Sequence, residues 1–182
     1  MKNIVCVECW ADRYFFGRLL NDFDLIRKEK NKNQVIKAFG NLKIKDKFLI
    51  GIVDEDKEDI LINPNLKEFE ILKTNINIKI YKHKINFHFI FALSPIAFES
   101  WLLEYINLQN QTLEDFDYSD FDSFLQETKN ESIHKVDRFK NVINYVMQNY
   151  NMTDNHINYT KIHLDYLIEK KYQFNIDEFL EI

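Results

Sequence analysis

The feature that most constrains the fold is an uninterrupted apolar run from Phe48 to Val53 that ends at Asp54. A strand without polar alternation is typically buried on both faces, as in a parallel sheet covered by helices. A shorter apolar run over residues 3–8 ends at Glu8, and apolar residues recur at helical spacing from Asp12 to about Lys30. We therefore expect an α/β fold with an open, mostly parallel sheet flanked by helices.

The middle of the chain suggests further short elements. A short apolar run, residues 35–39, is read as another strand, which makes the N-terminal order β, α, β, β. A short helix is expected near residues 65–73, and an alternating strand from Ile76 to Ala92. Ser94 and Pro95 predict the start of a helix over residues 96–108.

The last third of the chain reads as helical. Amphipathic patterns predict helices near residues 112–128, 133–150, 156–171 and 175–181. The 182 residues, 46% of them hydrophobic, are enough for one core. We expect an α/β core over 1–110 and a helical extension over 111–182 packed on it, as one compact domain.

Charge is distributed unevenly along the chain. Residues 1–92 carry 17 Lys and Arg against 13 Asp and Glu, whereas residues 93–182 carry 7 against 16. The basic half could face a polyanion through metal ions, while the acidic half is poorly suited to contact nucleic acid. A solvated surface without a partner is the simpler interpretation. No apolar run reaches the roughly 20 residues of a membrane span, and we expect a cytoplasmic protein.

Carboxylates stand at two strand ends, Glu8 after the first strand and the triplet from Asp54 to Asp56 after the apolar run. Repulsion between such groups is relieved by a hard divalent cation, so they predict a Mg²⁺ or Mn²⁺ site. Asp54 and Asp56 can share one side of the chain, and Glu55 is the odd one out. The candidate phosphate-binding residues alternate on the later strand: Lys82, Lys84 and His88.

The strand ending at Glu8, the helix after Asp12 and the strand ending in Asp54-Glu-Asp56 together resemble the Toprim domain of topoisomerases, primases, OLD-family nucleases and small ribonucleases. The resemblance implies phosphodiester chemistry with Mg²⁺, with Glu8 as general acid/base or metal ligand and Asp54 and Asp56 as metal ligands. The family's glycine after the glutamate is Cys9 here.

The segment from His88 to Leu103 is similar to one in Toprim-like proteins of bacterial defence, including the RloB-like group, which implies Glu99 as a further acidic ligand. The resemblance covers roughly residues 3–108.

The leading hypothesis is a metal-dependent nuclease, or a related phosphotransferase, in which Glu8, Asp54 and Asp56 are catalytic. The alternative is an inactive Toprim-like interaction module that works with a partner ATPase and forms homo-oligomers through its C-terminal helices. A third reading, a thiol redox pair of Cys6 and Cys9, is disfavoured because Cys6 lies inside an apolar strand. The acids also have plain structural readings as strand-end, turn and helix-start residues.

Overall fold

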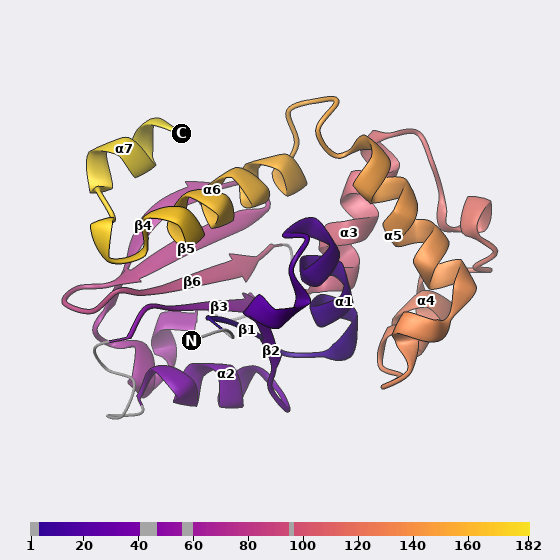
Figure 1. Cartoon of the computed structure of the whole chain (residues 1–182). Coiled ribbons are helices and arrows are strands. Elements are labelled where there is room, and N and C mark those ends of the chain that lie inside the picture. Colours follow the sequence, from indigo (N-terminus) through magenta and orange to yellow (C-terminus); the bar gives the residue numbers. More distant parts are fainter. Residues whose placement is uncertain (1–3, 41–46, 56–59, 95–96) are drawn as a thin grey trace.

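The computed structural model describes residues 4–40, 47–55, 60–94 and 97–182 (Figure 1). Within these ranges one six-stranded sheet has the order β2-β1-β3-β6-β5-β4. Neighbours from β2 to β6 pair in parallel, and β5 pairs antiparallel with both β6 and β4. The expected α/β class with a mostly parallel sheet is therefore confirmed. The strands are β1 (Val5–Val7), β2 (Ile26–Lys28), β3 (Leu49–Asp54), β4 (Phe69–Asn75), β5 (Ile78–His83) and β6 (His88–Leu93).

Seven α-helices in the described part of the chain surround this sheet. Figure 1 shows α2 below the sheet and α6 above β4 to β6, with α4 and α5 beyond α1 and α3. The buried side chains form two clusters. The smaller one lies between α2 and the sheet, and the larger one joins the other face of the sheet to the remaining helices. The helices are α1 (Trp10–Leu19), α2 (Lys32–Phe39), α3 (Phe98–Leu108), α4 (Phe121–Thr128), α5 (Asp137–Asn149), α6 (His156–Lys170) and α7 (Ile176–Glu181).

Strand β3 is buried on both faces, as its sequence predicts. Ile50 and Ile52 belong to the larger cluster, while Leu49 and Val53 belong to the smaller cluster between α2 and the sheet. Alternate side chains of a strand point to opposite faces, so one run of apolar residues feeds both clusters.

Two predictions for the N-terminal third are wrong. The expected helix from Asp12 to Lys30 ends at Leu19, because Asn21 adopts a left-handed backbone with φ of 53° and the chain then forms a 3₁₀ turn and β2. Residues 35–39 are not a strand but the end of α2, whose N-cap is the side chain of Asn31. The order is therefore β, α, β, α, β.

The middle segments also differ from expectation. The expected helix over 65–73 is a 3₁₀ turn, Pro64–Leu66, followed by β4. The stretch from Ile76 to Ala92 is a hairpin, β5 and β6, rather than one strand. Helix α3 begins at Phe98 with Ala97 as its N-cap, so the predicted cap at Ser94 is wrong, and Pro95, the predicted first helical residue, lies outside the described residues. The helices expected near 133–150, 156–171 and 175–181 are present as α5 to α7, within four residues of the expected bounds. The helix expected near 112–128 is present only from Phe121, as α4, and is preceded by a 3₁₀ turn, Leu113–Phe116.

Gly51 in β3 lies where a larger residue would meet α2. A Cβ atom there would stand 2.9 Å from Cε2 and Cζ of Phe39 and 3.1 Å from Cγ1 of Val35. We expect Gly51→Ala to lower the free energy of unfolding by about 1–2 kcal/mol, because Phe39 is packed and its ring must shift. Urea denaturation with Gly40→Ala as control tests this, since a Cβ at Gly40 has no neighbour closer than 3.7 Å. Equal midpoints for the two variants would contradict the close contact.

No helix in these described ranges has the combined length and apolarity needed to cross a membrane.

Candidate functional site

The candidate site lies at the carboxyl ends of β1 and β3, which are parallel neighbours in the sheet. Glu8 follows the last residue of β1, and Asp54 is the last residue of β3. Oε1 of Glu8 accepts a hydrogen bond of 2.8 Å from the backbone N–H of Asp54. The topology thus brings together two acids that are 46 residues apart.

The side chain of Asp54 also connects β3 to the start of α3. Its Oδ1 accepts a hydrogen bond of 2.8 Å from the backbone N–H of Phe98, the first residue of α3. The N-cap residue of this helix, Ala97, has only a methyl side chain and cannot accept this hydrogen bond. Asp54 therefore caps α3 from another element and draws the next residue, Glu99, towards the strand ends.

Asp12, in the first turn of α1, is a fourth acid at the same place. Its Oδ2 accepts hydrogen bonds from the backbone N–H groups of Glu8, at 3.2 Å, and Cys9, at 3.0 Å. Its Oδ1 is buried and has no hydrogen-bond partner among the described residues. A buried carboxylate oxygen without a partner is costly, so this atom calls for a proton or a cation.

Glu99, the second residue of α3, is 8% exposed. Its Oε1 accepts a hydrogen bond of 2.6 Å from Oγ1 of Thr128, at the end of α4. One of its two carboxylate oxygens is thus committed to a helix-to-helix contact.

Mutual repulsion marks the four acids as one electrostatic unit. Burial raises the pKa of Asp54 to about 9, and the negative charges of Asp12, Glu8 and Glu99 contribute. Burial, with a contribution from the charge of Glu99, raises the pKa of Asp12 to about 6. The carboxyl-end cluster, which we define as Glu8, Asp12, Asp54 and Glu99, therefore favours extra positive charge.

Two lysines, Lys32 and Lys79, lie next to this cluster. Nζ of Lys32 donates to the backbone oxygens of Asp54, at 2.5 Å, and Glu55, at 3.2 Å. Lys79 forms an ion pair with the Glu55 carboxylate. No sequence pattern indicated Lys32, because neither β2 nor α2 was expected from the sequence.

The predicted phosphate-binding residues lie elsewhere. Lys82 pairs with Phe89, whereas Asp54 pairs with Leu93, four residues further along β6. At about 3.3 Å per residue, this separates Lys82 from Asp54 by roughly 13 Å along the sheet. His88 is fully buried between the rings of Phe39 and His83. The backbone N–H of Lys84 donates to Glu68 at that same end of the sheet.

Asp56, the third predicted catalytic residue, lies outside the described residues. Within the ranges that are described, no three His, Cys, Asp or Glu side chains are grouped so as to hold a metal ion. The cluster is therefore an assembly of neighbouring carboxylates rather than a formed chelate.

The two cysteines have structural roles here. Cys6 is fully buried in β1, and Sγ of Cys9 accepts a hydrogen bond of 3.3 Å from the backbone N–H of Asp12 as the N-cap of α1. Burial raises the pKa of Cys6 to about 11 and raises that of Cys9 as well.

Because thiolates rather than thiols react, we expect neither cysteine to be alkylated by iodoacetamide within an hour at pH 7.5 in the folded protein. Mass spectrometry before and after unfolding in urea tests this. Rapid labelling of Cys6 in the native state would revive the redox reading.

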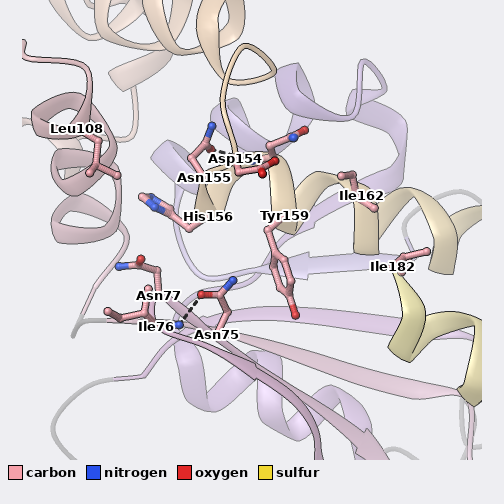
Figure 2. Close-up of a pocket in the computed structure, with 11 residues that line it drawn as sticks. Asn75, Ile76, Asn77, Leu108, Asp154, Asn155, His156, Tyr159, Ile162 and Ile182 are labelled. Carbon is pink, nitrogen blue, oxygen red and sulfur yellow. Dashed lines mark hydrogen bonds between the residues drawn. The ribbon is translucent and has the colours of Figure 1, made fainter.

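A separate cavity of about 370 Å³ lies between the β4–β5 turn and the start of α6 (Figure 2). None of the four acids lines it. His156 does, and burial lowers the pKa of this histidine to about 4.

Comparison with protein-family models, curated proteins and solved structures finds no match to this chain.

The raised pKa of Asp54 makes stability depend on pH. Between pH 7 and 9 this group is protonated in the folded state but ionised in the unfolded chain, so stability falls as pH rises through this window. We expect a loss of about 1 kcal/mol per pH unit, or about 3 °C in Tm. The buried histidines His156 and His163, with pKa values lowered to about 4, are neutral in both states there.

Calorimetry in EDTA at pH 7, 7.5 and 8 measures this dependence below the range in which the thiols of Cys6 and Cys9 ionise in the unfolded chain, and Asp54→Asn should flatten it. An equal slope in the wild-type protein and the variant would show that other groups cause it.

Proposed function

We propose that the carboxyl-end cluster binds Mg²⁺ or Mn²⁺ and hydrolyses phosphodiester bonds in nucleic acid. The observation that carries this proposal is the gathering of four carboxylates at the carboxyl ends of β1 and β3, where Asp12 and Glu99 are buried, Glu8 and Asp54 are half-buried, and the pKa of Asp54 is raised to about 9. Ligands of open α/β sheets bind beyond the carboxyl ends of the strands. The sequence resemblance to Toprim proteins implies metal ligands at Glu8, Asp54 and Asp56, and the first two are members of this cluster.

The residues present fit a hard divalent cation. All their donors are oxygens, and the unpartnered Oδ1 of Asp12 is a buried acceptor beside them. Mg²⁺ keeps several waters and is often held by only one or two carboxylates, so a ready-made group of three ligands is not required. Glu8, Asp54 and Asp56 would hold the ion, with Glu99 beside them.

A bound cation would supply charge to a phosphoryl oxygen and lower the pKa of a water molecule. The protein's own contribution is proton transfer and positioning. Glu8 would accept the proton of the attacking water. The hydrogen bond from the backbone N–H of Phe98 holds the Asp54 carboxylate in one orientation.

A second candidate function rests on the same hydrogen bonds. Each acid of the cluster already accepts a hydrogen bond that a purely structural residue would make. The cluster could then be the frame of an inactive module that works with a partner ATPase through its C-terminal helices.

Manganese binding distinguishes the two candidates. Electron paramagnetic resonance of Mn²⁺ titrated with the intact chain should show about one bound ion, and labelled DNA or RNA oligonucleotides should then be cleaved. Binding without cleavage of either polymer would favour the interaction module. Absence of Mn²⁺ binding would remove the basis of the enzyme proposal.

A further inference from the structure

One face of α1 presents cations and aromatic rings beside the carboxyl-end cluster. Trp10, Arg13, Tyr14 and Arg18 are spaced at i, i+3, i+4 and i+8, so they share a side of the helix, and all four are half-buried. Trp10 is two residues from Glu8, which places the start of this face next to the acids.

Packing holds the rings and cations in place. The Arg13 guanidinium lies 5.6 Å from the Trp10 ring centroid and 5.9 Å from that of Phe23. Phe23 lies over Gly17, where a Cβ atom would come within 2.4 Å of its ring. Arg18 donates a hydrogen bond of 3.2 Å to the hydroxyl of Tyr14. We call Trp10, Arg13, Tyr14, Arg18, Phe23 and Lys28 the α1 face.

Lys28 joins this face from the edge strand β2. It pairs in register with Val7, the residue before Glu8, and its Nζ lies 5.4 Å from the Trp10 ring centroid. Its neighbour Arg27 is instead engaged with Glu29 in an ion pair of 2.7 Å. Of the residues described, no acid forms an ion pair with Arg13, Arg18 or Lys28.

Cations without acidic partners, held over half-exposed rings, match the chemistry of a nucleic-acid strand. Phosphates pair with the cations, and unpaired bases stack on aromatic side chains or on guanidinium planes. A base in a duplex is already stacked and cannot use the rings in this way. Phe23, 38% exposed, has surface to offer.

We propose that the α1 face binds single-stranded nucleic acid and leads its backbone to the carboxyl-end cluster, with Arg13 and Lys28 contacting phosphates and Trp10 stacking on a base. This inference rests on the proposed function for the identity of the polymer. It differs from that function in needing no metal and no cleavage.

Fluorescence anisotropy of labelled 12-nucleotide dT and rU strands, in EDTA, tests the inference separately from catalysis. We expect R13Q/K28Q to weaken binding at least tenfold and to reduce the slope of log K against log salt by about 1.4, since each cation lost from a single-strand site removes about 0.7. The matched control, K161Q/K170Q, removes two positive charges from α6 and should change affinity less than twofold. Trp10→Leu, which keeps the charge, should weaken binding by about fivefold or more.

Several outcomes would overturn the inference. The inference fails if neither strand binds the wild-type chain, or if the two double variants lose equal affinity. It also fails if a 12-base-pair duplex binds more tightly than the single strands, or if an uncharged probe binds as tightly as an anionic probe that poly-glutamate displaces. Circular dichroism melting of each variant confirms that it is folded. If strands bind as expected but are never cleaved with Mn²⁺, the proposed function fails and the α1 face stands. If R13Q/K28Q cleaves and binds like the wild type, the α1 face fails alone.

Discussion

Asp54→Asn should abolish Mn²⁺-dependent cleavage while leaving the fold intact or more stable. The variant removes a negative charge that would hold the cation, and we expect a loss of roughly 10³-fold or more in rate, equivalent to about 4 kcal/mol of transition-state stabilisation. The asparagine oxygen can still accept the hydrogen bond from Phe98, so α3 keeps its cap. Because Asp54 must take up a proton on folding at pH 8, whereas asparagine is neutral in both states, the substitution should raise Tm at this pH.

This pairing of lost activity with gained stability separates a functional acid from a structural one. Glu55→Gln is the matched control, since it makes the same change in charge one residue away, at a side chain paired with Lys79. Cleavage rates by gel assay and Tm by calorimetry give both readouts. Full activity in Asp54→Asn would refute the metal mechanism, and a large drop in Tm would assign Asp54 to the frame of α3.

The parts of the fold that could be predicted are those with a strong local pattern. The run ending at Asp54 reads as a doubly buried strand from its composition alone, and the C-terminal helices from their periodicity. Strand β2 has three residues and no pattern of its own, and it exists because it pairs with β1. The apolar residues of α2 are few enough to suit either a strand or one helix face, and the cap at Asn31 decides between them.

From local sequence patterns the site could be predicted only where acids follow strand ends, and Glu99 was indicated by the family resemblance alone. Glu8 and Asp54 meet because parallel neighbours end at one edge of the sheet. The position of Asp12 depends on its hydrogen bonds to the loop after β1, and that of Glu99 on the capping of α3 by Asp54. Neither contact has a signature in the sequence.

The predicted phosphate-binding set failed to approach the acids for a topological reason. Residues 76–92 were expected to form one strand, whereas they form a hairpin. In the hairpin Lys79 pairs with Ala92, near the end where Asp54 lies, whereas Lys82 pairs with Phe89, four residues before the partner of Asp54.

Trp101→Ala should cause the largest loss of stability of any variant considered. Trp101 is fully buried on α3, with ring centroids 5.7 Å from Phe15 and 4.8 Å from His156. Truncation leaves a cavity where α1, α3 and α6 meet, and we expect a loss of about 3–5 kcal/mol. This is a large share of the 5–15 kcal/mol that stabilises an ordinary domain, so partial unfolding at 37 °C is the expected result.

Two variants show whether volume or polarity sets this loss. The indole N–H of Trp101 is buried without a hydrogen-bond partner among the described residues, so Trp101→Phe discards an unsatisfied donor and should lose less than about 1.5 kcal/mol. Trp10→Ala, at a half-buried position, should lose about 1 kcal/mol. Urea denaturation gives all three values. If Trp101→Phe lost as much stability as Trp101→Ala, the cavity left by truncation would not explain the loss. A contact of the indole other than packing would then hold α3 in place and set the stability of this region.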